Sequence, residues 1–247
     1  MKKLIVNADD FGFTRGVNEG ILRAHREGIV TASTLMADGP AFAHAVEAAR
    51  ATPSLDVGVH LVLWPAPGVQ PGAAFEEWRL PRRVPWFVAR ALWSSSGAIE
   101  AEFCRQVQKV RAAGLCPSHL DTHKHLHLLP WVMKAVVAVA RRFAIPWVRR
   151  PLYRRQATAR GLRVPDYLVG FRLTGTMNRN TLLRGLSRLR PGLSELVCHP
   201  GLFDQELERA PTCLKQQRQV ELEALTDPEV RRLLERQGVE LTSYRDC

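Results

Sequence analysis

The amino-acid sequence predicts an α/β fold, an irregular (β/α) barrel of the TIM type, from three observations. Strand-like and helix-like segments alternate from the N-terminus onward, which is the pattern of a parallel sheet flanked by helices. The chain has 247 residues, a usual length for one α/β barrel, and 46% of them are hydrophobic, which is enough for a large core. Several expected strands end in carboxylates or histidines, and a barrel gathers its strand ends at one site. We therefore expect one domain over residues 1–247.

The N-terminal strand and the helix after it carry clear local signals. Residues 3–10, KLIVNADD, begin with an apolar run and predict a strand, and Thr14 is a suitable cap for a helix over 14–29. Apolar residues at helical spacing support that helix: Val17, Ile21, Leu22 and Ala24. The other expected strands are 31–37, 56–63, 118–123, 146–151, 194–200 and 239–244. The other expected helices are 41–51, 98–113, 130–143, 178–189 and 215–236, whereas residues 152–175 show no clear pattern.

An aromatic, proline-rich insertion interrupts this alternation at residues 64–97. It holds prolines at positions 65, 67, 71, 81 and 85 and four of the six tryptophans, Trp64, Trp78, Trp86 and Trp93. A segment that follows a barrel strand belongs to the loops of the active-site face. We therefore expect the insertion beside the active site, where its rings could stack on sugar, contact lipid or pack as a small core.

The cysteines and the first residues bear on the cellular compartment. Five cysteines are scattered without CxxC spacing, which argues against a disulfide framework and against a structural zinc site. The apolar run after MKK is too short for a signal peptide, and no segment is long enough to span a membrane. These features predict a cytoplasmic protein.

The net charge of +11 and a pI near 10.1 raise the question of an anionic partner. Nucleic acid is not expected, because no nucleic-acid-binding motif accompanies the arginines. A soluble basic enzyme would explain the charge, and so would peripheral contact with an anionic membrane such as the inner membrane surface. Both explanations stay open, as does the oligomeric state, for which a homodimer is one option.

Four expected strands end in residues typical of a metal hydrolase. Two adjacent carboxylates, Asp9 and Asp10, repel each other unless a cation or a shared proton relieves them, so they predict a cation nearby. The cluster HLDTHKHLH is too long for all its histidines to bind one ion, because an extended strand rises about 3.3 Å per residue. The histidine at the end of the strand is the better ligand, and the later ones would line the mouth or orient ligands. The candidates are Asp9, Asp10, His60, the cluster from His119 to His127, and His199.

Each candidate also has a structural explanation. His60 could be a hydrogen-bonded core histidine, the aspartates could cap a turn or helix, and His199 could begin a turn before Pro200. Their joint occurrence at four strand ends favours a metal site over these separate explanations.

The motifs NADDFG, GVHLVL, SHLDTHKHLH and CHPG, in this order over nearly the whole chain, resemble those of the YdjC-like carbohydrate deacetylases. That family includes chitooligosaccharide deacetylases and a hopanoid-biosynthesis-associated branch. The resemblance implies an irregular barrel that uses a divalent metal to remove the acetyl group from an N-acetylated amino sugar. Its site residues would be Asp10, His60 and His123 as metal ligands, Asp9 as base, His199 as general acid, and Arg149 and His125 near the substrate.

These residue types suit that chemistry. An Asp, His, His set binds a divalent ion and leaves positions for water and a substrate oxygen. The family implies Mg²⁺, whereas two histidines suit Zn²⁺ at least as well by ligand preference. Asp9 would take the proton of the attacking water, and His199 would give a proton to the departing amine.

Alternatives remain for the substrate and for the class of protein. The acceptor could be an amino sugar carried on a lipid such as a hopanoid, which the insertion and the basic charge favour, or a soluble chitooligosaccharide. An amidohydrolase or phosphoesterase also uses His and Asp at strand ends, but an amidohydrolase would prefer HxH on its first strand. A catalytically inactive sugar- or lipid-binding barrel would lack the base or a ligand, and neither is missing here.

Overall fold

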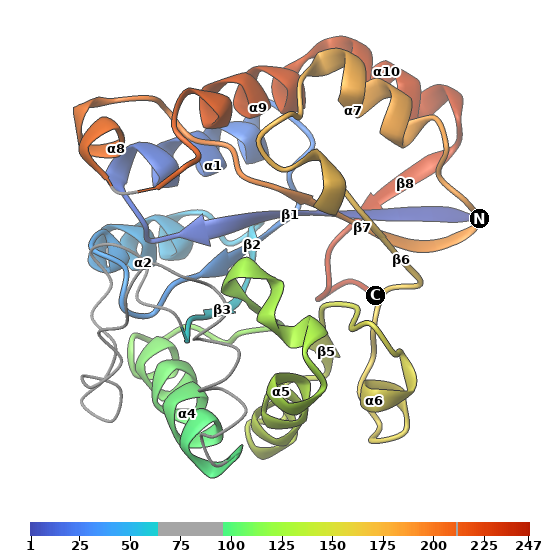
Figure 1. Ribbon diagram of the computed structural model, residues 1–247. Helices are drawn as coiled ribbons and strands as arrows, with labels where there is room; N and C mark the ends of the chain where they lie inside the picture. The colour runs from blue at the N-terminus through green and yellow to red at the C-terminus, as the bar shows by residue number, and fades with distance from the viewer. Residues whose placement is uncertain (64–95, 211) are drawn as a thin grey trace.

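A computed structural model describes residues 1–63, 96–210 and 212–247 of the chain. Within these residues, eight parallel strands form one curled sheet, and helices surround it (Figure 1). The strands are β1 (Lys2–Phe11), β2 (Ala32–Leu35), β3 (Asp56–Leu61), β4 (His119–Thr122), β5 (Trp147–Val148), β6 (Tyr167–Val169), β7 (Gly192–Cys198) and β8 (Val239–Thr242). The α-helices are α1 (Arg15–Arg26), α2 (Phe42–Ala51), α4 (Ser96–Ala112), α5 (Pro130–Arg142), α6 (Arg155–Thr158), α7 (Arg179–Leu186), α8 (Gln205–Arg209), α9 (Gln216–Thr226) and α10 (Pro228–Arg236). The 3₁₀ helices in the described part of the chain are η2 (His123–Leu128) and η3 (Phe171–Leu173).

The strand order explains why the barrel is irregular. The strands follow the order β5-β4-β3-β2-β1-β7-β6, and β8 pairs with the first residues of β1. Strand β1 is long enough to pair with β8 at its start and with β2 at its end, on one edge. Within the described residues no strand pairing joins the two ends of the path, β5 and β6; an isolated bridge pairs Trp147 of β5 with Arg163, which lies between α6 and β6. We call this gap between β5 and β6 the seam; the expected irregular (β/α) barrel is confirmed.

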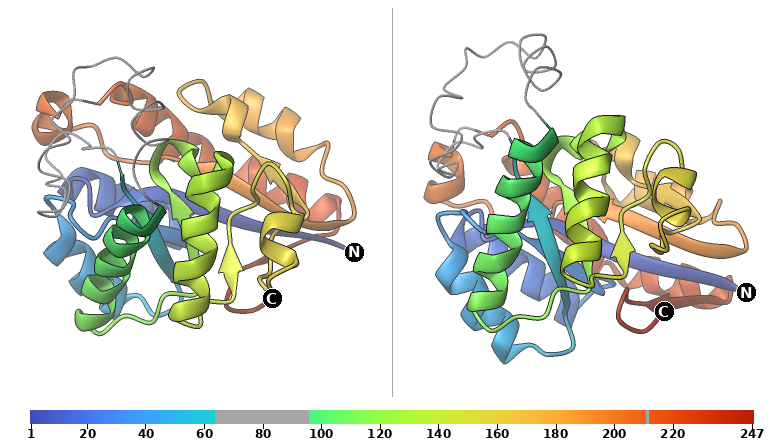
Figure 2. Two further views of the ribbon diagram at one scale, coloured as in Figure 1. Left: turned by 60° about the horizontal axis from the view of Figure 1, so that its bottom comes forward. Right: turned by 90° about the horizontal axis from the view of Figure 1, so that it is seen from below.

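The helices cover the sheet through the apolar faces that their sequences predict. In α1 the Thr14 side chain accepts a hydrogen bond from the backbone N–H of Val17 (3.1 Å), so the expected cap is confirmed. Helices α4 and α5 lie side by side along the sheet, as both views of Figure 2 show. Burial of each large apolar side chain stabilises the fold by about 1.5–3 kcal/mol. On α4 these fully buried side chains are Ile99, Phe103, Val107 and Val110.

Two expectations about the second half of the chain need correction or completion. The helix expected over 215–236 is two helices, because Asp227 caps α10 by accepting from the N–H of Glu229 and Pro228 begins that helix. The segment without a clear pattern, 152–175, contains α6, β6 and η3. Strand β6 has only three residues, which is too short for alternation to be recognised.

The expected insertion at 64–97 lies almost entirely outside the described residues, which omit 64–95 and with them its tryptophans. The single domain over 1–247 stays a prediction. None of the described helices is both long and apolar enough to cross a bilayer.

Candidate functional site

The end of β1 is irregular, and this irregularity brings two neighbouring carboxylates to one site. In a regular strand, successive side chains point to opposite faces. The pairing of β1 with β2 shifts between Ala8 and Phe11, and Asp10 has a φ of 68°, a left-handed conformation that aspartate tolerates better than most residues. As a result Asp9 and Asp10 both face the cavity described below.

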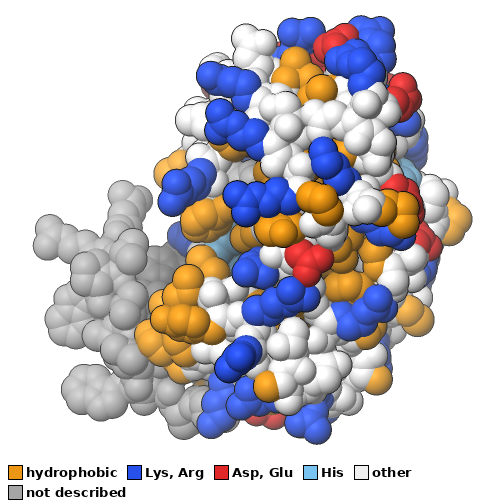
Figure 3. All heavy atoms as spheres, turned by 90° about the vertical axis from the view of Figure 1, so that its right-hand side faces the viewer, with side chains coloured by type: hydrophobic (Ala, Val, Ile, Leu, Met, Phe, Trp, Pro, Cys, Tyr) orange, Lys and Arg blue, Asp and Glu red, His pale blue; other side chains and the backbone are white. Residues whose placement is uncertain are grey.

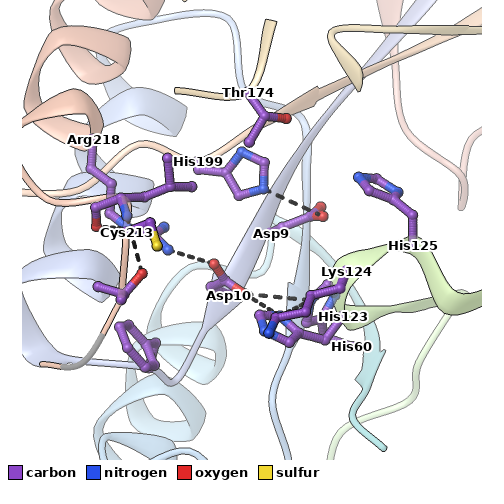
Figure 4. A pocket seen from close by; sticks show the side chains of 13 residues that line it. Asp9, Asp10, His60, His123, Lys124, His125, Thr174, His199, Cys213 and Arg218 are labelled. Carbon is purple, nitrogen blue, oxygen red and sulfur yellow. Dashed lines mark hydrogen bonds and ion pairs between the residues drawn. The ribbon is translucent and has the colours of Figure 1, made fainter. Parts of the chain in front are cut away.

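Three side chains from different strands converge as a candidate metal site (Figure 4). Asp10 lies at the end of β1, His60 lies on β3, and His123 directly follows β4. His60 Nε2 is 3.2 Å from His123 Nδ1, and Asp10 Oδ1 is 3.4 Å and 3.2 Å from these two nitrogens. Neighbouring ligands around an ion with bonds of about 2.1 Å are roughly 3.0–3.4 Å apart. The spacing and the donor types therefore fit a divalent metal.

Asp121 orients His60 for this role. The His60 Nδ1–H donates to Asp121 Oδ1 at 2.7 Å, so that Nε2 is the nitrogen directed at Asp10 and His123. Burial lowers the pKa of His60, but Asp121, Asp10 and Asp9 outweigh burial and raise it to about 10. These carboxylates thus favour positive charge at this position, as a cation site requires.

Asp9 is held by a separate set of contacts. Arg149 donates two hydrogen bonds to it, at 2.7 and 2.8 Å, and Asn7 donates a third to Oδ1 at 2.9 Å. Each carboxylate oxygen can accept about two hydrogen bonds, so the open position is on Oδ2. His199 Nε2 is 3.9 Å from this oxygen. Burial would raise the pKa of Asp9, but Arg149, with His60 and His199, holds it well below its usual value.

Arg149 lies beneath the cavity rather than in its lining. Its side chain is fully buried and also binds Asp121 (2.8 Å) and Glu195 (2.7 Å). The family resemblance implies a place for this residue near the substrate, whereas the structure shows it one layer below, against Asp9. It therefore acts on the site through the carboxylates that it holds.

Helix α9 contributes two buried charges that the sequence analysis missed. Arg218 donates to Asp10 Oδ2 at 2.6 Å, which leaves Oδ1 for the metal position. Glu221, one turn later, accepts the backbone N–H of His199 at 2.6 Å. The signal was present in the sequence, because both residues share the buried face of α9 with Leu222 and Leu225. Charged residues on an apolar face suggest partners inside the protein.

The histidine cluster divides into several roles because the chain turns after β4. Lys124 and His125 both have left-handed backbone angles, φ 55° and 53°, so the segment does not stay extended. His125 lines the cavity and packs edge-on against Phe171, with ring centroids 4.7 Å apart. Burial, with Arg149, lowers the pKa of His125 to about 3, so its ring is neutral near pH 7. His119 lies deeper, and its Nε2 is 2.9 Å from Asn7 Oδ1.

A cavity of about 250 Å³ unites these residues at the carboxyl ends of the strands, where a barrel places its active site. Of the seven site residues that the family resemblance implies, all but Arg149 line it, whereas His119, Asp121 and His127 of the wider histidine cluster do not. The described residues around it are Asp9, Asp10, Phe13, His60, His123, Lys124, His125, Thr174, His199, Thr212, Cys213, Leu214 and Arg218.

The chain is similar to known proteins over nearly its whole length. The family model described as YdjC-like protein matches residues 3–236. A carbohydrate deacetylase from Geobacillus stearothermophilus is 38% identical over 248 residues, which cover 98% of this chain and 96% of the relative. A carbohydrate deacetylase from Vibrio vulnificus (strain CMCP6) is 34% identical over 251 residues, with 99% and 96% covered.

Solved structures show the same fold. A candidate cellobiose-phosphate cleavage protein from Enterococcus faecalis V583 superimposes with a TM-score of 0.87 at 28% identity, covering 99% of this chain and 98% of that one. A family 4 carbohydrate esterase from Streptomyces lividans, in complex with acetate, has a TM-score of 0.57 at 13% identity and covers 99% and 94%. That second likeness concerns the fold alone.

Fold and site together define an α/β barrel with a candidate metal centre at its strand ends. Within that class, the chain belongs to the YdjC-like family. The resemblance noted from its motifs is thereby confirmed for the family, and its hopanoid-associated branch stays a prediction.

Proposed function

We propose that the protein is a metal-dependent carbohydrate deacetylase that removes the N-acetyl group from an amino sugar. The observation that carries the proposal is the convergence of Asp10, His60 and His123 within 3.4 Å of one another, beside Asp9. The relatives named carbohydrate deacetylase support the same activity.

Asp10, His60 and His123 would hold the divalent ion. When bound there, the ion would supply a Lewis acid and lower the pKa of a water molecule. Mg²⁺ is proposed from the family resemblance, and Zn²⁺ is the alternative that the two histidines allow. Metal analysis of the purified protein separates these two ions.

Asp9 is proposed as the general base. Its Oδ2 has an open acceptor position, and Arg149 keeps the carboxylate ionised and fixed in place. This oxygen can take a proton from water held in the cavity. A protonated His199, across from Oδ2, is proposed to give its own proton to the departing amine as the carbon–nitrogen bond breaks.

Arg149 and His125 complete the proposed roles. Arg149 is a positioning residue, because it contacts Asp9, Asp121 and Glu195 but does not line the cavity. His125 is proposed to contact the sugar, since its neutral ring lines the cavity and offers a hydrogen-bonding nitrogen.

The finer identity of the acceptor is also a proposal. We propose an amino sugar linked to a lipid such as a hopanoid, met by a cytoplasmic protein at the inner membrane surface. The basic charge of the chain supports this acceptor. A soluble chitooligosaccharide is the alternative acceptor that the family resemblance supplies.

The test is acetate release from a panel of N-acetylglucosamine conjugates, both soluble and lipid-linked, with and without a chelator. We expect release that stops on chelation and returns when metal is added. Release that is unaffected by exhaustive chelation would overturn the metal-dependent mechanism. Faster turnover of soluble chitooligosaccharides than of lipid-linked sugars would identify the soluble acceptor.

A further inference from the structure

The positive charge of the protein is concentrated in one segment. Residues 150–190 contain ten arginines and one acidic residue, Asp166. The rest of the chain contains 25 lysines and arginines and 23 aspartates and glutamates. A general enrichment in arginine would spread over the chain, so this concentration calls for a local explanation.

The segment forms a surface on both sides of the seam. It includes α6, β6, η3 and α7, and Figure 3 shows the side of the molecule on which α6 and β6 lie. Basic side chains far outnumber acidic ones in that view. Nine of the ten arginines are exposed, and within the described ranges only Arg154 and Arg179 make ion pairs, with Asp166 and Asp227. The surface therefore presents cationic side chains that carboxylates of this chain do not neutralise.

Large apolar side chains are exposed among these arginines. Leu152 and Tyr153 are each 60% exposed in the loop after β5, and Phe171 is 42% exposed in η3, after β6. They are three of the five exposed large hydrophobic residues in the described part of the chain, together with Met1 and Val220. Apolar side chains between cations are the combination that an anionic lipid interface stabilises.

This surface reaches the candidate active site. Phe171 packs against His125, which lines the cavity, and Thr174 at the other end of η3 lines it too. A flat partner that contacts Phe171 would therefore lie beside the cavity.

We propose that this surface docks the protein on an anionic lipid bilayer. We name it the seam surface and define it by Leu152, Tyr153, Phe171, Arg155, Arg160 and Arg172. Docking itself does not depend on the proposed function, whereas delivery of a lipid-linked amino sugar to the cavity rests on it. A second copy of the chain is a poorer partner, because a two-fold interface would bring two such basic segments together. A nucleic acid would use the charge but would leave the exposed Leu152 without a suitable contact.

Liposome co-sedimentation of the full-length protein tests the proposal, with phosphatidylcholine vesicles that contain or lack phosphatidylglycerol. Wild-type protein should pellet with the anionic vesicles at low salt and be released at high salt. The triple variant Arg155→Gln, Arg160→Gln, Arg172→Gln should bind on the order of 100-fold more weakly, since each arginine near an anionic surface contributes roughly fivefold.

Matched controls separate a defined surface from net charge. Arg26→Gln, Arg141→Gln, Arg232→Gln removes the same charge from exposed positions on α1, α5 and α10 and should weaken binding far less. The double variant Leu152→Ser, Tyr153→Ser should also weaken binding, whereas Val220→Ser on α9 should not. Asp9→Asn should bind vesicles like the wild type but lose deacetylation. The experiment thus tests membrane docking separately from the proposed catalytic activity.

Several results would overturn the proposal. One is that wild-type protein does not bind anionic vesicles. Another is that the two triple arginine variants lose vesicle binding equally. A third is that the protein binds duplex DNA and that this DNA competes with the vesicles. Conversion of a dimer to a monomer by Leu152→Ser, Tyr153→Ser, seen by sedimentation, would show that the surface joins two copies instead.

Discussion

Asp9 and Asp10 are neighbours in the chain, yet they belong to two differently built halves of the site. In the Asp9 half, a fully buried arginine, Arg149, joins three carboxylates below the cavity. In the Asp10 half, Arg218 lines the cavity and holds one carboxylate, whose other oxygen faces two histidines. One half is thus closed from below by an arginine, and the other is open toward a cation.

This difference shows how one fold can give two adjacent carboxylates different chemistry. The Asp9 half fixes a charged group whose only open acceptor position faces the cavity. The Asp10 half leaves a position that a metal ion can fill. The following predictions test whether the two halves are as distinct as their contacts indicate.

The largest effect should come from the histidines of the Asp10 half. His60→Ala and His123→Ala should each lose bound metal, and activity should fall on the order of 10³-fold or more, because a metal ion supplies several kcal/mol of transition-state stabilisation. Metal content by mass spectrometry and acetate release measure both effects. His25→Ala, on α1 outside the site, is the control. Full activity of either site variant after chelation would show that the metal position is wrong.

The next largest effects should come from the two aspartates: Asp9→Asn should lose rate, and Asp10→Asn should lose metal affinity. Asp9→Asn should keep its metal while its rate falls about 10² to 10⁴-fold, the usual contribution of a general base. Asp10→Asn should bind metal more weakly and regain part of its activity at high metal concentration. Calorimetric metal titration and steady-state rates measure the two effects. The opposite pattern would exchange the two roles.

The two arginines should differ in their effect on stability. Arg149→Gln should lower the free energy of unfolding by about 3–5 kcal/mol, because it removes the cation that three buried carboxylates share. Arg218→Gln should cost about 2 kcal/mol, the range for one hydrogen bond to a charged group. Added metal should offset the loss for Arg218→Gln, since a cation near Asp10 replaces the missing charge.

Urea unfolding with and without metal measures this comparison between the arginines. Equal losses for Arg149→Gln and Arg218→Gln, or a metal effect on the Arg149 variant alone, would contradict the division into closed and open halves.

The smallest effect should come from an ion-pair cluster outside the site. Asp38 accepts hydrogen bonds from Arg105 and from Lys109, the latter at 2.8 Å, and both cations are partly exposed. Burial raises the pKa of Asp38, but these two partners outweigh burial and lower it. Asp38→Asn should cost about 1 kcal/mol or less near pH 7 and leave metal binding unchanged.

The pH dependence of this cluster follows from the sign of the shift. A carboxyl group with a lowered folded-state pKa contributes stability above its unfolded value of about 3.9, and this contribution is lost as pH falls through the folded value. The stability difference between wild type and Asp38→Asn should therefore be present near pH 7 and disappear in strong acid. Urea unfolding at both pH values measures it, and a difference that persists in acid would assign the effect to packing instead.

The sequence by itself determined the α/β class and the strand-end candidates. Both depend on local signals: the alternation of apolar periods, the Thr14 cap, and polar residues such as Asp10 and His60 directly within or after apolar runs. These signals need no knowledge of distant contacts, because the end of a parallel strand places its residues at the active-site edge. The Asp227–Pro228 helix break was equally local, although the expected helix 215–236 overlooked it.

Only the tertiary structure decided how the candidates are held. Arg149 lies 140 residues from Asp9 in the chain, and Arg218 lies 208 residues from Asp10, so no local pattern pairs them. The register shift in β1, which lets adjacent aspartates face one cavity, depends on the partner strand β2. The turn at Lys124 likewise redirects histidines that an extended strand would have kept in line. The residue types at the strand ends can be predicted from the sequence alone. The buried charged residues that determine the role of each site residue come from distant parts of the chain, so only packing across the barrel brings them together.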